Sequence, residues 1–165
     1  MSTYFEDFVV GATIDLGSHA FTAEDIVSFA RRFDPQLFHL DHEMAKETIF
    51  GGLCASGWHT AAVWMRLMVQ YRKRTAAEIA AAGGTPPRLG PSPGFRELKW
   101  LKPVYAGDVI AFRSTPEDKI ELKSRPEWGL LVTRNEGANQ SGDLVLSFLG
   151  QVFVERRPTD LPRTA

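Results

Sequence analysis

The sequence predicts an α+β fold in which an antiparallel sheet wraps around one long central helix. The chain has 165 residues, which is the length of one ordinary domain. Its first half carries apolar residues at helical spacing, and its second half alternates apolar and polar residues as strands do. The segment Ala82–Gly94, which is dense in glycine and proline, separates the two halves. One long helix followed by successive antiparallel strands is an α+β arrangement.

The first predicted helix begins at Thr22, after a short extended stretch around Ala12–Leu16. Thr22 is of a residue type that caps helices, and Pro35 ends the helix because its ring disfavours helical geometry at Asp34. The carboxylate of Asp34 is therefore expected off the helix end, where it is free to face a cavity. Apolar side chains at helical spacing form one stripe along this helix: Ile26, Phe29, Ala30 and Phe33.

A second, longer helix is expected to begin near Ser56-Gly57 and to run to about Arg74. Its apolar residues surround the helix instead of forming a single stripe, so we expect it to be buried on most sides. The basic residues 72–74 fall at its expected C-terminus, where positive charge complements the helix dipole. The apolar pattern is carried by Trp58, Ala61, Ala62, Val63, Trp64, Met65, Leu67, Met68 and Val69.

From Phe95 onward the pattern is that of strands separated by turns. Strand-like runs are expected around Leu98–Trp100 and Ile120–Leu122, and over Val109–Thr115, Leu130–Asn135 and Leu144–Val154. Turn residues lie between them at 106–108, 116–118, 126–129 and 139–142. Turns at such short spacing predict an antiparallel meander.

The composition excludes several classes of function. A formal net charge of −1 argues against electrostatic binding of nucleic acid or of an anionic membrane. The longest apolar stretches, such as Ala61–Met65, are too short to span a bilayer. The N-terminus starts acidic and has no basic stretch before an apolar core, so we expect no signal peptide and a cytoplasmic location. The single cysteine, Cys54, precludes an internal disulfide and a cysteine-rich zinc site.

The most suggestive chemical feature is the pair Asp34 and His39, which lie five positions apart across the turn at Pro35. Such a turn can bring a carboxylate and an imidazole to one small volume, where they could hold and deprotonate a water. The alternative is that Asp34 ends a turn and His39 satisfies local backbone groups, and the spacing alone favours this alternative. A metal site built from residues 39, 41 and 42 is not expected, because neighbouring side chains of an extended segment point in opposite directions.

The segment Phe50–His59 is a glycine-containing turn that runs into the long helix. The unpaired N–H groups at a helix start form a site for negative charge, including a developing oxyanion. Gly57 has no side chain to obstruct a carbonyl group there, although the glycine could also serve only a tight turn. We expect Ser56 to cap the helix instead of acting as a nucleophile, Cys54 to belong to the core, and His59 to be packed and hydrogen-bonded.

Charge around the long helix is one-sided. No Asp or Glu occurs from Thr48 through Ala77, whereas Arg66 and the basic residues 72–74 do. A positive local field could attract a phosphate-bearing ligand such as a coenzyme A thioester. The helix-end explanation already accounts for three of these four charges.

Taken together, these segments resemble the MaoC-like dehydratase family, whose best-known enzymes are the (R)-specific enoyl-CoA hydratases with a hot-dog fold. Asp34 and His39 match the family's catalytic segment, and Ser56-Gly57 falls where the family has the glycine that opens its central helix. The stretch Lys102–Asp108 looks like the family's Pro-Val…Gly-Asp strand-turn. The resemblance covers the chain from about Phe5 to Arg156, and it implies a single hot-dog domain over residues 1–165.

The resemblance also implies an enzyme, a hydro-lyase that adds or removes water across the 2,3-double bond of an enoyl thioester. Asp34 and His39 would activate the water and supply the proton. Gly57 and Ser56 would form the oxyanion and substrate-binding site, in which the N–H of Gly57 holds the thioester oxygen. The implied substrate is an acyl thioester of fatty acid metabolism, and its carrier, coenzyme A or an acyl carrier protein, stays open. No metal or redox cofactor is implied, since coenzyme A enters only as part of the substrate.

The sequence departs from the family's usual pattern around the site. Many hydratases have Asn-Pro just before the histidine, and here the proline is Pro35, directly after Asp34. Ser56-Gly57 replaces the common His-Gly, and Met65 stands where a hydroxyl group is often found. Two alternatives to hydration therefore stay open, a hot-dog acyl-CoA thioesterase and a non-catalytic acyl-binding subunit. A homodimer is expected in each case, because an isologous partner would cover the sheet edges and the apolar helix.

Overall fold

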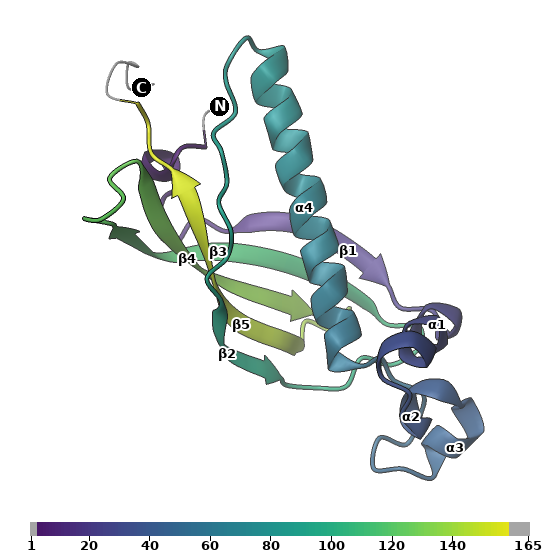
Figure 1. Cartoon of the computed structure of the whole chain (residues 1–165). Coiled ribbons are helices and arrows are strands. Elements are labelled where there is room, and N and C mark those ends of the chain that lie inside the picture. The colour runs from purple at the N-terminus through teal and green to yellow at the C-terminus, as the bar shows by residue number, and fades with distance from the viewer. Residues whose placement is uncertain (1–2, 159–165) are drawn as a thin grey trace.

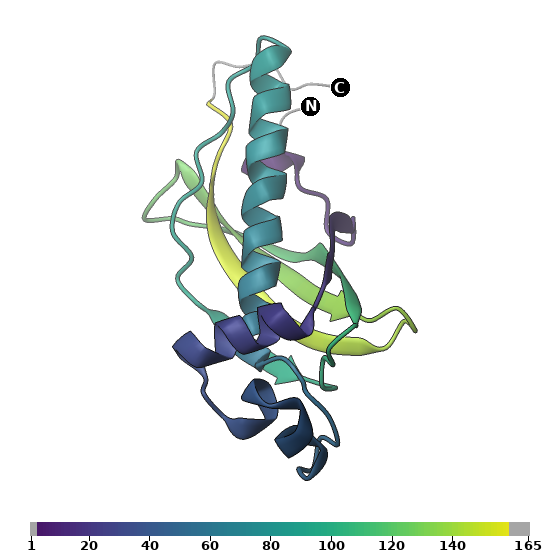
Figure 2. The ribbon, with the colours of Figure 1, turned by 90° about the vertical axis from the view of Figure 1, so that its right-hand side faces the viewer.

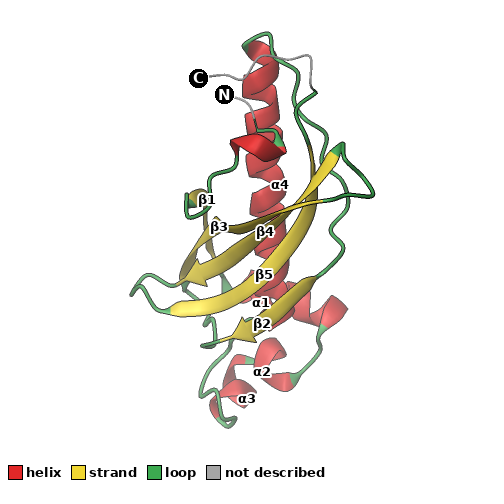
Figure 3. Cartoon of the chain, turned by 90° about the vertical axis from the view of Figure 1, so that its left-hand side faces the viewer, coloured by secondary structure: helices red, strands yellow, loops and turns green. Residues whose placement is uncertain are grey.

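The computed structural model describes residues 3–158, in which a five-stranded antiparallel sheet curves around one long helix (Figure 1). The sheet order is β1-β3-β4-β5-β2, so both edge strands come from outside the consecutive β3–β4–β5 meander. Figure 3 shows the sheet face with the long helix, α4, behind it. The strands are β1 (Ile14–Ala20), β2 (Phe95–Trp100), β3 (Val109–Glu121), β4 (Trp128–Ala138) and β5 (Leu144–Glu155).

The helices gather at the end of the molecule where α4 begins (Figure 1). Thr22 caps α1 as expected, with its side chain accepting a hydrogen bond of 3.1 Å from the N–H of Asp25. The helix ends at Phe33, one residue before Asp34, as the position of Pro35 predicts. The helical elements are a 3₁₀ turn, η1 (Phe5–Asp7), and the helices α1 (Ala23–Phe33), α2 (Leu37–Leu40), α3 (His42–Lys46) and α4 (Gly57–Ala81).

The long helix α4 begins at Gly57 as expected, but it ends at Ala81 and not near Arg74. The expected end was wrong because residues 75–82 contain five alanines, which are the strongest helix formers. The helix stops only at the following glycine, Gly83, whose φ of 78° lies in the left-handed region. The basic residues 72–74 therefore lie inside the helix, and its last turn holds no basic residue.

The packing of α4 also differs from the expectation of burial on most sides. Val63, Trp64 and Met68 are buried against the sheet, where they join Phe112 and Leu146 in the main apolar core. Other apolar side chains of the same helix remain open to solvent in the single chain. Trp58, Met65 and Val69 are 53%, 50% and 41% exposed.

The strand β3 continues through residues 116–118, where the sequence indicates a turn. Pro116 is fully buried on the inner face of the sheet, and the pairing of β3 with β4 is irregular between Pro116 and Asp118. A proline has no N–H to donate and is tolerated in a sheet at such an irregularity. The turns at 106–108 and 139–142 are present, with the N–H of Asp108 bound to Tyr105 and that of Gly142 bound to Asn139.

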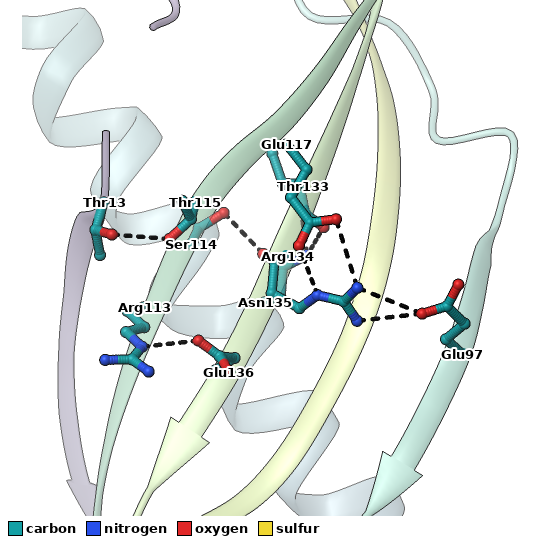
Figure 4. Close-up of polar contacts among 10 residues, drawn as sticks. All are labelled: Thr13, Glu97, Arg113, Ser114, Thr115, Glu117, Thr133, Arg134, Asn135 and Glu136. Carbon is teal, nitrogen blue, oxygen red and sulfur yellow. Dashed lines mark hydrogen bonds and ion pairs between the residues drawn. The ribbon is translucent and has the colours of Figure 1, made fainter. Parts of the chain in front are cut away.

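Polar side chains lie at the centre of the sheet (Figure 4). Ser114 of β3 donates a hydrogen bond of 2.8 Å to the side-chain oxygen of Asn135 on β4, and both residues are buried. The Asn135 amide nitrogen donates in turn to the carbonyl and the hydroxyl of Thr133. Arg134, the next residue along β4, binds the carboxylates of Glu117 and Glu97 in the same view.

The breaker-rich segment 82–94 is irregular, as expected, and returns alongside α4 (Figures 1 and 2). Its backbone is tied to β5, since Gly90 donates to the carbonyl of Phe153 and Glu155 donates to that of Arg88. Among the described residues, no helix combines the length and the apolarity that crossing a bilayer requires. The segment and α4 form the walls of the cavity described below.

Candidate active site

The turn after α1 brings Asp34 and His39 together. Asp34 is the C-cap residue of α1, with its N–H still bound to the carbonyl of Ala30 at 2.9 Å. Pro35 breaks the helix, and the single turn α2 then carries His39 back toward the helix end. Asp34 Oδ2 lies 3.5 Å from His39 Nε2. The structure thus places the two sequence-predicted residues side by side.

A backbone carbonyl fixes the orientation of the His39 ring. Nδ1 of this buried ring lies 2.7 Å from the carbonyl oxygen of Cys54. Because a carbonyl oxygen only accepts hydrogen bonds, Nδ1 carries the proton, and in the neutral ring Nε2 has a free lone pair. That lone pair lies on the same side of the ring as Asp34. Nε2 and the Asp34 carboxylate are therefore two proton acceptors that a single water could contact.

Hydrogen bonds keep the Asp34 carboxylate ionised. Partial burial by itself would raise the pKa of Asp34, but hydrogen bonds from Ser56 and Gln36, together with a smaller contribution from the neighbouring His39, lower the pKa below its ordinary value. Gln36 Nε2 donates to Asp34 Oδ1 at 2.8 Å. At neutral pH the residue is therefore a carboxylate that can accept a proton from a water.

The N-terminus of α4 lies next to this pair. Ser56 is the N-cap residue, as expected, because its hydroxyl oxygen accepts a hydrogen bond of 3.2 Å from the N–H of Trp58. The Ser56 side chain also lowers the pKa of the Asp34 carboxyl, so one serine acts both on the helix start and on the carboxylate. The N–H of Gly57 is the first of the helix and has no carbonyl of that helix to bind, which leaves it available to an oxygen of a ligand.

Trp100 of the edge strand β2 covers Gly57. A Cβ atom at position 57 would overlap the indole ring of Trp100, so the glycine is required here for packing. Trp58 lies edge-on to the same indole, with ring centroids 5.2 Å apart. The sequence does not predict the contact of Trp100 with Gly57, because nothing local in residues 95–100 indicates which helix residue the strand will face.

Cys54 and His59 lie near Asp34 and His39 but are not part of the acid–base pair. Cys54 is buried, as expected, and burial raises the pKa of its thiol to about 11, so it is a poor nucleophile. His59 is packed, with its ring stacked on Phe29 at 4.5 Å, but its Nδ1 has no hydrogen-bond partner. The expectation of a hydrogen-bonded histidine was therefore wrong for this atom, since the ring packs between Phe29 of α1 and Phe21, which follows β1.

A cavity of about 610 Å³ begins one residue beyond Gly57 and follows α4. On the helix it is lined from Trp58 to Ala76, and its other walls come from the inner face of the sheet and the segment 82–94. Met65, the residue expected to replace a hydroxyl group, is part of its wall. Within residues 3–158, no group of three or more His, Cys, Asp and Glu side chains could hold a metal ion.

The acid–base pair lies beside the N-terminus of α4, and the apolar cavity begins at the next helix residue, Trp58, although Asp34, His39 and Gly57 do not themselves line it. A water held by two acceptors at Asp34 and His39 can lose a proton to the pair as its oxygen attacks a carbon. A carbonyl oxygen that gains negative charge in the same step is stabilised by a backbone N–H. The arrangement therefore suits an addition or elimination of water next to a carbonyl group.

Residues 7–133 match the protein family described as MaoC like domain. The structure of the MaoC-like dehydratase from Rhodospirillum rubrum is 37% identical in sequence, with a TM-score of 0.78 over 95% of this chain and 99% of that chain. The Bacillus subtilis protein YdeM, which is uncharacterised, is 35% identical over 92% of this chain and 98% of its own length.

The mesaconyl-CoA hydratase of Cereibacter sphaeroides matches over a shorter stretch. It is 40% identical over 74 residues, which are 44% of this chain but only 21% of the hydratase. A Mycobacterium tuberculosis protein with a double hot-dog fold superposes with a TM-score of 0.70 over 98% of this chain at 16% identity. The five-stranded antiparallel sheet around one long helix is thus a hot-dog fold, as expected.

Proposed function

The chain belongs to the MaoC-like domain family, and from this premise we propose that it adds water reversibly across the 2,3-double bond of an enoyl thioester. The observation that carries the proposal is the pair Asp34 and His39, with Oδ2 and Nε2 3.5 Å apart beside the N-terminus of α4. The family and the partial similarity to a mesaconyl-CoA hydratase support a thioester as the substrate.

The pair acts as base and acid in turn. One water donates its protons toward Nε2 of His39 and toward Asp34, and its oxygen attacks the β-carbon of the enoyl group. The pair accepts one proton and returns a proton to the α-carbon, so it ends the cycle unchanged. The hydrogen bond from Nδ1 to the carbonyl of Cys54 keeps Nε2 turned to the water throughout.

The thioester oxygen gains enolate character when the β-carbon is attacked. The N–H of Gly57 is proposed to hold this oxygen, while Ser56 positions Asp34 through its hydroxyl. The acyl chain then enters the cavity along α4, which begins at the neighbouring Trp58. The proposed reaction uses no metal or redox cofactor, and coenzyme A takes part only as the carrier in the substrate.

A homodimer is part of the proposal. Three apolar side chains of α4 are exposed in the single chain: Trp58, Met65 and Val69. The edge strand β2 adds Phe95 and Trp100, which are also exposed. An apolar surface of this kind, next to a sheet edge, is typical of an isologous interface between two copies.

Hydration is tested by following the loss of enoyl absorbance with trans-2-enoyl-CoAs of several chain lengths. Asp34→Asn and His39→Ala are each expected to lower kcat/KM by at least about 10²-fold, since each removes half of the acid–base pair. Asp41→Asn is the matched control, because the Asp41 carboxylate only caps α3 by binding the N–H groups of Glu43 and Met44. Full activity in a folded Asp34→Asn variant would refute the assignment.

The same incubations separate the two alternatives. Release of a free thiol without loss of the double bond would indicate a thioesterase. The position of the Trp100 indole over Gly57 favours the second alternative, a non-catalytic acyl-binding subunit. Thermal stabilisation by an acyl-CoA without turnover of any enoyl-CoA would indicate that function.

A further inference from the structure

Arg72 is a half-buried arginine of α4 that lines the apolar cavity. Its guanidinium forms no hydrogen bond or ion pair with any of residues 3–158. The other partly buried arginines each bind carboxylates: Arg134 binds Glu117 and Glu97, Arg156 binds Glu6, and Arg157 binds Asp7. Burying part of a charged guanidinium without a partner costs free energy. The packing of the fold does not explain why Arg72 stands at this position.

Among residues 3–158, no carboxylate forms an ion pair with Arg72. Asp7 is the one acidic residue among those that line the cavity, and its carboxylate binds Arg157 and the N–H of Tyr4. Burial alone lowers the pKa of Arg72, with no neighbouring negative charge to raise it again. The guanidinium therefore stays positive in a mainly apolar wall, without a partner among residues 3–158.

The position of Arg72 along α4 sets the length of a ligand that could extend from Gly57 to its guanidinium. A helix rises about 1.5 Å per residue, so the Cα atoms of Gly57 and Arg72 are about 22 Å apart along α4. The Arg72 side chain leans back toward the helix N-terminus, as long side chains on helices do. Between the two positions the wall is apolar, with Met65, Met68 and Leu98 among its residues.

We propose that this cavity takes a long apolar chain that ends in a carboxylate, and that Arg72 binds the carboxylate at the far end. An apolar wall with a single unpaired cation matches the two parts of such a ligand. The carboxylate has two possible sources, the distal end of an acyl chain held as a thioester or a free fatty acid. The first source rests on the proposed function, whereas the second does not.

Binding of a simple chain tests the cavity without any reaction. Titration calorimetry with dodecanoate and dodecanol at neutral pH compares two ligands that differ only in the end group. The full-length protein is expected to bind the carboxylate at least about tenfold more tightly than the alcohol. Arg72→Met should remove this preference, while Lys73→Met should keep it, because Lys73 is an exposed cation of the same helix that does not line the cavity.

Arg72→Lys serves as the conservative variant, and it is expected to retain part of the preference because it keeps the charge. Thermal unfolding shows whether each variant is folded. If Arg72→Met does not fold, the comparison of the two ligands on the natural chain still decides. Equal affinity of the natural chain for dodecanoate and dodecanol would overturn the proposal.

The source of the carboxylate is found by kinetics. We compare kcat/KM for trans-2-enoyl-CoAs that end in a methyl group with those that end in a carboxylate, at several equal lengths. A carboxylate preference that grows with chain length and is lost in Arg72→Met assigns the cavity to the acyl chain of the substrate. A preference confined to free dodecanoate supports a separate fatty acid. Absence of all turnover refutes the proposed function, but the calorimetric result for Arg72 remains decisive.

Discussion

The indole of Trp100 occupies the space that a side chain at position 57 would need. Gly57 opens α4 and Trp100 ends the edge strand β2, so the contact joins two elements far apart in the chain. The glycine therefore has a packing role in addition to the proposed use of its N–H. This double role makes the position sensitive to any substitution.

Gly57→Ala should displace the indole and lower the free energy of unfolding by about 1–3 kcal/mol, because the new methyl group overlaps the ring. In a Trp100→Ala background the same substitution should cost far less, since the space is then open. Urea unfolding of the four proteins in this double-mutant cycle measures the coupling. Additive effects of the two substitutions would contradict the close contact.

Ser56→Ala should change both stability and the pH dependence of activity. Loss of the N-cap hydrogen bond is expected to lower the free energy of unfolding by about 1 kcal/mol. Loss of the hydrogen bond to Asp34 should raise the pKa of that carboxyl, because this bond favours its ionised form. The acid limb of the kcat/KM profile should then move to higher pH.

Thr22→Ala is the matched control for Ser56→Ala, since it removes the cap of α1 without touching Asp34. It should cost a similar amount of stability and leave the pH–rate profile in place. Profiles of the two variants that shift together would show that the effect of Ser56 comes from stability alone.

His59 should make the protein less stable in acid. Burial, together with the positive charges of His19 and Arg66, lowers the pKa of this histidine from 6.5 to about 4. Between these two pH values the unfolded state binds a proton that the folded state does not, so stability falls as the pH falls through this window. The slope is on the order of 1.4 kcal/mol per pH unit, and His59→Phe should remove it while keeping the stacking on Phe29.

Urea unfolding at a series of pH values measures the His59 effect. His42→Gln is the control, because His42 is exposed and should leave the slope as it is. The same acid sensitivity in the His59→Phe variant would show that other groups are responsible for it.

Met65→Glu should dissociate the proposed homodimer, because it places a charge in the exposed apolar face of α4. Analytical ultracentrifugation is expected to show a dimer for the natural chain and a monomer for the variant. Ser124→Glu adds the same charge in the exposed turn between β3 and β4 and should leave the dimer intact. A natural chain that sediments as a monomer would refute the interface.

Short-range patterns were enough to predict where the chain turns at Asp34 and where α4 begins, whereas the pairing of Asp34 with His39 was inferred from the family resemblance, because the spacing alone favoured a structural role for both. Asp34 and Ser56 are placed by local signals, namely a proline after a helix and a cap before the next one. The long-range contacts were not predictable, because the residue that Trp100 faces depends on how β2 joins the sheet. The hydrogen bond between His39 and the carbonyl of Cys54, which fixes the orientation of the imidazole, is likewise a contact that local patterns do not predict.

Two errors in the elements have local physical causes. Pro116 indicates a turn by its residue type, but its buried side chain fits the inner face of β3 at an irregular point of the pairing. The basic residues 72–74 suggest a helix end, yet the alanines that follow continue the helix. For Pro116 tertiary packing outweighed the turn preference of a single residue, and for residues 72–74 the helix propensity of the following alanines outweighed the basic residues as an end signal.

The bond between Ser114 and Asn135 has a consequence for strand alignment. A strand that alternates apolar and polar residues keeps the same face inward after a slip of two residues, so apolar patterning cannot reject that slip. With β4 displaced by two residues, the Asn135 amide would lose the hydroxyl of Ser114 and stay buried, at a cost of about 1–3 kcal/mol. One buried amide thus selects a single alignment of β3 and β4 among those that the core alone would accept.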